Sequence, residues 1–312
     1  MIQLVTKNNM ICDLETGVCG VAGEEEFKVI DLQKQQKKID LYYVTDPICS
    51  HCWGLEPVLR RFKEQYGHYF NFHTVMGGLL EKWDGGPVDP GNGIFSPKDV
   101  AGHWREVGKF TRMPIDGSLM IDNPVQSSYP PSRVYKVIQN HYGNEKADEF
   151  LRRAREAFFA FNQNIGESQV LTEIVNDLGL DGEEIIKKAE SEVGEDLLKQ
   201  DFKLAADLGV RGFPTIIMLN ENNKGVRIVG SRPLVNYIAG LSRLLENEDL
   251  KPKTPPSLEN LLEKEKLLFA KEIEVMYDLQ PAELATFIKE NLAPGTYEEK
   301  ELLGEKYYVK IQ

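Results

Sequence analysis

The stretch DPICSHCW, residues 46–53, decides the fold of this chain of 312 residues. The residues before it, IDLYYVT at 39–45, are β-branched, aromatic and apolar, as in a buried strand. After it, apolar residues recur at helical spacing as far as residue 66. We therefore expect Cys49 and Cys52 to lie where a strand gives way to a helix.

Such a position suits a pair of redox cysteines. The unsatisfied N–H groups and the positive dipole end of a helix start favour a thiolate, so we expect a lowered pKa at Cys49. Cys52, one turn further, would point toward the core and act as the resolving thiol. His51 would add positive charge near the Cys49 sulfur. The expected catalytic side chains are therefore Cys49, His51 and Cys52.

A zinc site is the alternative use of a C-x-x-C pair. A tetrahedral zinc site needs four ligands, usually from two such pairs. The other two cysteines, Cys12 and Cys19, are separated by six residues, which fits no common zinc ribbon. A two-residue turn at Glu15-Thr16 would place them opposite each other. Three interpretations stay open for Cys12 and Cys19: a cross-strand disulfide, a second redox pair that passes electrons to Cys49, and a flexible arm carrying two unpaired thiols. We expect no metal.

A second motif, GVRGFPTIIML, lies at residues 209–219. Pro214 comes directly before an apolar strand that starts at Thr215. Proline is the residue that adopts a cis peptide bond at low cost, and a thioredoxin fold requires a cis-proline opposite its C-x-x-C. We therefore expect a cis Phe213–Pro214 bond beside the cysteines, where the backbone of Phe213 would pair with an extended substrate. The alternative is an ordinary proline at a strand start.

Together, residues 46–53 and 210–215 resemble the DsbA family of thioredoxin-fold proteins. Within that family the chain most resembles the FrnE-like branch and the YjbH/SpxH-type adaptors of Gram-positive bacteria, which present a transcription regulator to the ClpXP protease. The likeness runs from about residue 39 to residue 312. It implies an α/β fold, a thioredoxin-like sheet with an all-helical insertion, and no cofactor. The residues expected to contact substrate are Ser50, Trp53, Phe213 and Thr215.

Composition and periodicity divide the chain into parts. Residues 1–38 are an N-terminal extension that carries Cys12 and Cys19. Residues 39–248 are the DsbA-like domain, with helical signals over about 96–200. Residues 249–257 are rich in proline and lysine, which is typical of a linker.

The remaining segment, 258–312, predicts a small α/β module. Two helices, 258–277 and 281–292, precede a hairpin, an order that is winged-helix-like. DNA binding would need a basic surface, but residues 251–312 contain nine Lys, no Arg and twelve Asp or Glu. We therefore expect the module to dock on the thioredoxin-like half or on another chain, and to help bind a protein partner.

The charge of the whole chain also restricts its partners. The sequence has 37 Lys and Arg against 49 Asp and Glu, a net charge of −12. Nucleic acids and anionic membranes both attract basic proteins, so neither is expected as a partner. No apolar run reaches the roughly 20 residues that a membrane helix needs, and residues 1–9 do not resemble a signal peptide. We expect a cytoplasmic protein.

The preferred interpretation is a thiol–disulfide oxidoreductase or isomerase, whose partners are protein thiols and disulfides or a thiol-reducing system. The first alternative is a non-catalytic adaptor that delivers a regulator to ClpXP. The second is a kappa-type glutathione transferase or a related isomerase. Those sites use a single Ser or Cys, so the intact Cys49 and Cys52 pair disfavours the second alternative.

Overall fold

The described part of the chain begins with a two-stranded hairpin. The computed structural model describes residues 10–13, 18–21, 38–83, 91 and 93–311. It divides into two units, 1–37 and 38–312.

In the first unit, β1 (Met10–Asp13) pairs antiparallel with β2 (Val18–Val21). Their register places Cys12 opposite Cys19, as the sequence predicted. The expected turn at Glu15-Thr16 lies outside the described residues.

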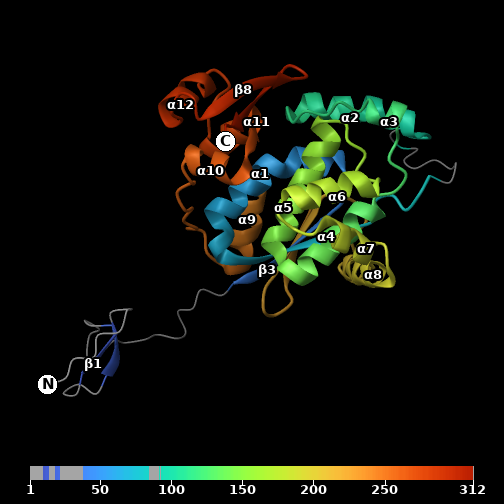
Figure 1. Ribbon diagram of the computed structural model, residues 1–312. Coiled ribbons are helices and arrows are strands. Elements are labelled where there is room, and N and C mark those ends of the chain that lie inside the picture. The colour runs from blue at the N-terminus through green and yellow to red at the C-terminus, as the bar shows by residue number, and fades with distance from the viewer. Residues whose placement is uncertain (1–9, 14–17, 22–37, 84–90, 92, 312) are drawn as a thin grey trace. The chain divides into compact units, whose positions relative to one another are not determined.

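A four-stranded sheet forms the centre of the second unit (Figure 1). Its order is β4-β3-β5-β6, with β3 parallel to β4 and the other neighbours antiparallel. A parallel pair requires a crossover connection, and the helix α1 with the 3₁₀ turn η2 supplies it. The bounds are β3 (Ile39–Thr45), α1 (Ser50–Tyr66), η2 (Gly67–Tyr69), β4 (Phe70–Met76), β5 (Thr215–Leu219) and β6 (Gly225–Val229).

Helices cover both faces of this sheet because its central strands are apolar on both sides. The helices α1 and α9 (Leu234–Leu245) share one core with the sheet, in which the rings of Phe62 and Tyr237 lie 5.8 Å apart. On the other face, Ala205 of α8 (Glu192–Asp207) packs against buried valines of β3 and β4. This double cover is typical of α/β proteins.

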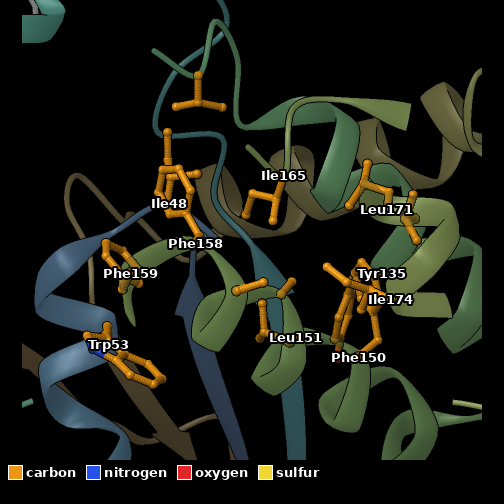
Figure 2. Packing of buried hydrophobic residues seen from close by; sticks show 14 of the residues in the cluster. Ile48, Trp53, Tyr135, Phe150, Leu151, Phe158, Phe159, Ile165, Leu171 and Ile174 are labelled. Carbon is orange, nitrogen blue, oxygen red and sulfur yellow. The ribbon is translucent and has the colours of Figure 1, made fainter. Parts of the chain in front are cut away.

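A helical insertion separates β4 from β5, as the sequence predicted. Its core is continuous with Ile48 and Trp53, which flank the cysteine pair (Figure 2). The π-helical segment η4 (Glu156–Ala160) continues α5 and brings Phe159 against Trp53, with ring centroids 5.8 Å apart. The remaining helices are α2 (Pro97–Thr111), α3 (Leu119–Asp122), α4 (Tyr129–Tyr142), α5 (Asn144–Arg155), α6 (Ser168–Asp177) and α7 (Gly182–Ala189).

No helix among the described residues is both long enough and apolar enough to span a membrane.

The C-terminal module contains helices and a small antiparallel sheet of order β7-β9-β8. Its apolar side chains form a core of their own, which includes Leu261, Ile273 and Tyr308. The elements follow in the order α10 (Leu258–Glu265), β7 (Leu267–Phe269), α11 (Ala270–Tyr277), α12 (Leu284–Asn291), β8 (Tyr297–Leu302) and β9 (Glu305–Lys310).

The prediction of one continuous helix over 258–277 is wrong. Lys266 has a φ of 59°, in the left-handed region, and ends α10. The three residues of β7 then pair with β9. Helical spacing of apolar residues does not distinguish one long helix from two helices joined by a short strand, because strand pairing with distant residues leaves no local signal.

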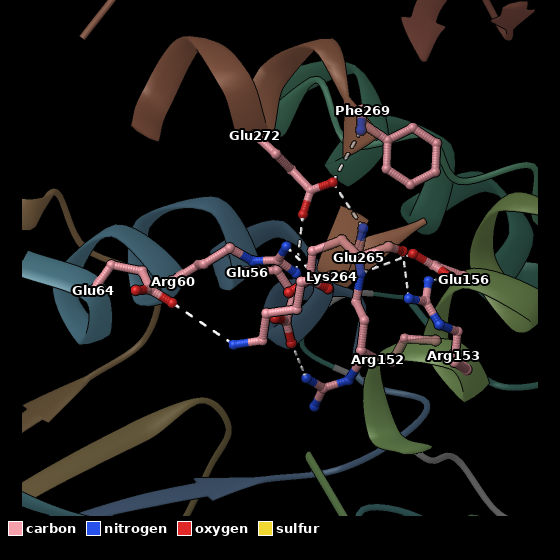
Figure 3. Close-up of polar contacts among 11 residues, drawn as sticks. Glu56, Arg60, Glu64, Arg152, Arg153, Glu156, Lys264, Glu265, Phe269 and Glu272 are labelled. Carbon is pink, nitrogen blue, oxygen red and sulfur yellow. Dashed lines mark hydrogen bonds and ion pairs between the residues drawn. The ribbon is translucent and has the colours of Figure 1, made fainter. Parts of the chain in front are cut away.

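Buried ion pairs hold this module against the thioredoxin-like half (Figure 3). Glu272 of α11, with its side chain 1% exposed, lies 2.7 Å from Arg152 of α5 and 3.4 Å from Arg60 of α1. Arg60 also lies 3.1 Å from Glu265 of α10. A ring of the module, Phe269, packs edge-on against Trp53 at 5.6 Å. The prediction that the module docks on the thioredoxin-like half is therefore confirmed.

We expect Glu272→Gln to lower the free energy of unfolding by about 3 kcal/mol, since removing one member of a buried ion pair leaves its partner uncompensated. We expect a loss of free energy at the low end of the usual range, because Arg152 would still have one carboxylate partner, Glu156, at 2.9 Å. Urea unfolding followed by circular dichroism measures the change.

The matched control is Asp207→Asn, which breaks the exposed Lys203–Asp207 pair and should change the free energy of unfolding by less than about 0.5 kcal/mol. Equal effects of the two substitutions would contradict a stabilising role for the buried cluster.

Candidate functional site

The cysteine pair lies at the N-terminus of α1. Cys49 is the N-cap residue with extended backbone angles, φ −82° and ψ 111°. Its Sγ accepts a hydrogen bond from the backbone N–H of Cys52 at 3.3 Å. Both thiols are free and buried, with Cys49 5% exposed and Cys52 0%. The predicted strand-to-helix position of the pair is confirmed, but Cys49 is less accessible than an attacking thiol was expected to be.

The electrostatics of Cys49 differ from the sequence prediction. Burial raises the pKa of the Cys49 thiol, and hydrogen bonding with Cys52 adds to that increase. The surrounding protein and the nearby His103, whose ring lies 5.6 Å away, lower the pKa of His51. His51 is therefore mostly neutral near pH 7 and supplies little of the positive charge that was expected beside Cys49.

The positive charge near the pair comes instead from a buried arginine of the insertion. Arg155, 0% exposed, donates hydrogen bonds to Thr45 Oγ1 at 2.5 Å and to the carbonyl of Asp46 at 3.0 Å, and pairs with Glu56. Burial opposes the Cys52 thiolate, but a hydrogen bond with Cys49 and the attraction of Arg155 outweigh it and lower the pKa of Cys52. The guanidinium thus favours the thiolate of Cys52 over that of Cys49.

A buried carboxyl fixes the loop that precedes the cysteines. Asp46, 0% exposed, accepts the N–H groups of Ile48 at 3.0 Å and Leu79 at 2.7 Å. Burial raises the pKa of Asp46 to about 6, although these hydrogen bonds favour the carboxylate. The carboxyl therefore ties the start of α1 to the loop after β4.

The proline motif lies at the same end of the sheet. The Phe213–Pro214 peptide bond is cis, as predicted. β5 pairs with β3 so that Thr215 lies opposite Val44, which brings Pro214 beside the end of β3 where the cysteine loop starts. Thr215 Oγ1 donates to the carbonyl of Gly212 at 2.7 Å and so closes the turn before the strand.

Phe213 is partly buried and lies against the backbone of Gly77, where any Cβ would come within 2.0 Å of its ring. Glycine is therefore required at position 77 for this ring to pack beside the proline turn. This packing fixes the orientation of the Phe213 side chain. That the backbone of Phe213 pairs with a substrate stays a prediction.

The other three predicted substrate contacts, Trp53, Ser50 and Thr215, are buried in this structure, with Thr215 1% exposed. Trp53 is 0% exposed, and its Nε1 donates to the carbonyl of Pro114 at 3.0 Å. Its ring lies between Phe159 of the insertion and Phe269 of the module and is not exposed to a substrate, because its side of α1 faces inward. Ser50 is 5% exposed.

Sequence reasoning missed the charged residues around the pair, namely Asp46, Glu56 and Arg155. Arg155 precedes the apolar run AFFA in an amphipathic helix and is 106 residues after Cys49. Only the folded chain, in which Arg155 contacts Thr45 at the end of β3 and Glu56 of α1, reveals its role. Among the residues that the structure describes, no three His, Cys, Asp or Glu side chains form a group able to hold a metal.

Comparison with known proteins identifies a family. The thioredoxin family model matches residues 42–238. The ClpXP adapter protein SpxH of Halalkalibacterium halodurans is 30% identical over 88% of this chain and 88% of its own length. SpxH of Bacillus subtilis is 29% identical over 81% of this chain and 83% of its own length. A solved putative protein disulfide isomerase from Nitrosomonas europaea shares the fold, with a TM-score of 0.55 and 22% identity, over 67% of this chain and 97% of its own.

We expect the double substitution Arg155→Met with Glu56→Gln to raise the pKa of Cys52, because the thiolate loses the attraction of the buried guanidinium. The paired change avoids leaving Glu56 as an uncompensated carboxylate. NMR of the Cys52 Cβ resonance across a pH series measures this pKa separately from those of the other cysteines.

The control is Glu56→Gln alone, which keeps the cation and should not raise the pKa of Cys52. An unchanged Cys52 pKa in the double variant would show that Arg155 does not stabilise the thiolate.

Proposed function

This chain belongs to the SpxH family of ClpXP adapter proteins, which has a DsbA-like thioredoxin fold, and from that membership we propose that it delivers a regulator protein to the ClpXP protease. One observation carries the proposal. The likeness to SpxH extends over 280 residues and therefore reaches beyond the thioredoxin match at 42–238. The likeness to the disulfide isomerase covers only 67% of the chain. The adaptor alternative is thus better supported than the preferred oxidoreductase.

The burial of the cysteine pair agrees with this proposal. An adaptor works through surfaces that bind two proteins and does not need an accessible nucleophile. Cys49 is 5% exposed, and burial raises the pKa of its thiol, so little thiolate is present near pH 7. The acidic chain and the docked module offer surface for protein partners, in keeping with the ClpXP link of the relatives.

We further propose that residues 39–248 act as the DsbA-like domain, that 249–257 act as a linker, and that 258–312 are a winged-helix-like module for protein binding. The order helix, strand, two helices and hairpin, with β7 paired to β9, supports the winged-helix-like description. The excess of acidic over basic residues from 251 onward disfavours DNA.

Purified ClpXP should degrade a regulator of the Spx type faster when this protein is added, because an adaptor raises the local concentration of the substrate at the protease. The disappearance of the regulator on denaturing gels measures the rate. The Cys49→Ser/Cys52→Ser variant should give the same acceleration, since the substitutions change little surface.

A protein that ClpXP degrades unaided is the control and should be unaffected. No acceleration by the wild-type chain would contradict the adaptor function. If the wild-type protein accelerates degradation of the regulator and the serine variant does not, thiol chemistry is part of the adaptor function.

The second candidate is thiol–disulfide exchange, which the free Cys49 and Cys52 beside a cis-proline favour. The Cys49 thiolate would attack a substrate disulfide, forming a mixed disulfide and releasing one substrate thiolate. Cys52 would then attack the Cys49 sulfur and release the second thiolate, leaving an oxidised pair and a substrate reduced by two electrons. A cellular dithiol would return the pair to its reduced form. Neither a metal nor an organic cofactor takes part in these steps.

With a disulfide-bonded model peptide, Cys52→Ser should accumulate a mixed disulfide on Cys49, whereas Cys49→Ser should not. Trapping should be slow near pH 7 and faster in alkali, because burial raises the pKa of Cys49. Mass spectrometry under non-reducing conditions identifies the adduct.

Both variants are made with Cys12→Ser and Cys19→Ser, so that only the pair at α1 can react. If no adduct forms even in alkali, the pair has no exchange activity with such peptides.

A further inference from the structure

A strand at the edge of the central sheet has no partner on its outer side. β6 is last in the order β4-β3-β5-β6, and only β5 pairs with it among the described strands. Beside it runs a shallow groove of about 500 Å³ between β6 and α9. The groove lies along the strand edge, and its lining includes Val226, Arg227, Arg232 and Arg243.

The register shows which backbone groups face outward. The N–H of Gly230 donates to the carbonyl of Pro214, and the N–H of Asn220 donates to the carbonyl of Lys224. Bonded and non-bonded pairs alternate in an antiparallel ladder. Arg227, opposite Ile217, and Val229, opposite Thr215, therefore belong to non-bonded pairs. Their N–H and C=O groups point to the free edge.

Few hydrogen bonds from described residues reach the outward N–H and C=O groups of Arg227 and Val229. Arg232 Nε donates to the carbonyl of Val229 at 3.1 Å, and no other hydrogen bond from a described residue reaches the outer edge of Arg227 or Val229. Val229, on the edge strand itself, is 51% exposed. The edge thus combines available backbone hydrogen-bonding groups with apolar surface, which is what an added strand requires.

The charged side chains that line the groove are all positive. Arg227, Arg232 and Arg243 line the groove and no carboxylate does. None of the three forms an ion pair with another described residue, and Arg227 Nη1 donates only to the carbonyl of Gly209, at 3.0 Å. On a chain of net charge −12, this is a local concentration of unneutralised arginine.

We propose that β6 is a docking edge for an acidic, extended segment of another protein, which adds to the sheet as a further strand and places carboxylates against Arg227, Arg232 and Arg243. Alternating side chains of such a segment fall on both faces of the sheet. Arg227 reaches toward the α8 side, where Gly209 lies, and Arg243 belongs to α9 on the other side.

Two other occupants fit less well. A second copy of this chain would bring the same three arginines to the same edge, and like charges directly opposite each other repel. Charged side chains on edge strands are a known protection against such pairing. A nucleic acid would use the arginines but not the outward N–H and C=O groups of the strand. The proposal does not depend on the adaptor function.

The test uses the full-length protein and a short fluorescent peptide in which glutamate alternates with valine. Fluorescence anisotropy should show binding that weakens as salt is raised. The Arg227→Glu/Arg243→Glu variant should bind about tenfold more weakly, because two attractive pairs become repulsive. A peptide of alternating lysine and valine should not bind the wild-type protein.

The control matched in charge is Lys109→Glu/Lys187→Glu, at exposed lysines of α2 and α7, which should leave the affinity unchanged. Val229→Pro removes an outward N–H without touching the bonds to β5, and should abolish binding while the arginines remain. Thermal unfolding checks that each variant is folded.

Three results would overturn the proposal. One is no binding of the acidic peptide by the wild-type protein. Another is equal binding by the wild type and the Arg227→Glu/Arg243→Glu variant. The third is self-association of the wild-type protein that depends on concentration and is absent from the Arg227→Glu/Arg243→Glu variant. That result would assign the edge to a second copy of this chain.

Discussion

A single buried guanidinium joins the three parts of the second unit. Arg152, on α5 of the insertion and 4% exposed, pairs with Glu156 of its own segment and with Glu272 of the C-terminal module. Its guanidinium carbon lies 4.9 Å from the ring centroid of Trp53 on α1 and 5.7 Å from that of Phe269. A buried cation is tolerated only while its partners stay in place. Moving the module away would therefore leave Arg152 short of a counter-charge inside the protein.

This constraint connects the module to the cysteine pair. Trp53 follows Cys52 directly, and its ring contacts Phe159 of the insertion and Phe269 of the module. Because packed interiors do not deform continuously, the start of α1 and the first strand of the module share one packing arrangement. The same core thus fixes both the thiol site and the position of the module. An adaptor function and a thiol function cannot be assigned to independent halves of this unit.

The sequence predicted the parts of the site that depend on local chain order. The strand before Cys49, the helix after it and the cis bond at Pro214 all leave short-range signals, namely apolar spacing and residue type. The charged residues around the cysteine pair left no such short-range signal in the sequence. Arg155 lies near the thiols because the fold brings the end of α5 to Thr45 at the end of β3, where the guanidinium donates a hydrogen bond. Lys266 ends a helix just before three residues that pair with β9. Both features arise from contacts between distant segments, which periodicity within a window does not record.

The turn at Pro214 keeps a thioredoxin-like backbone although Cys49 is buried. At the turn before β5, the cis bond at Pro214 and the Phe213 ring packed on Gly77 set the direction of the backbone beside the cysteines. In the functions proposed above, the backbone of this turn would pair with an extended polypeptide, and that step needs no electron transfer. With Cys49 buried, and with the nearby cation favouring the thiolate of Cys52, the pair is placed poorly for rapid attack while the backbone geometry is intact. The proposed binding of a partner would therefore not require rapid exchange by the cysteine pair, because fold and activity are separable.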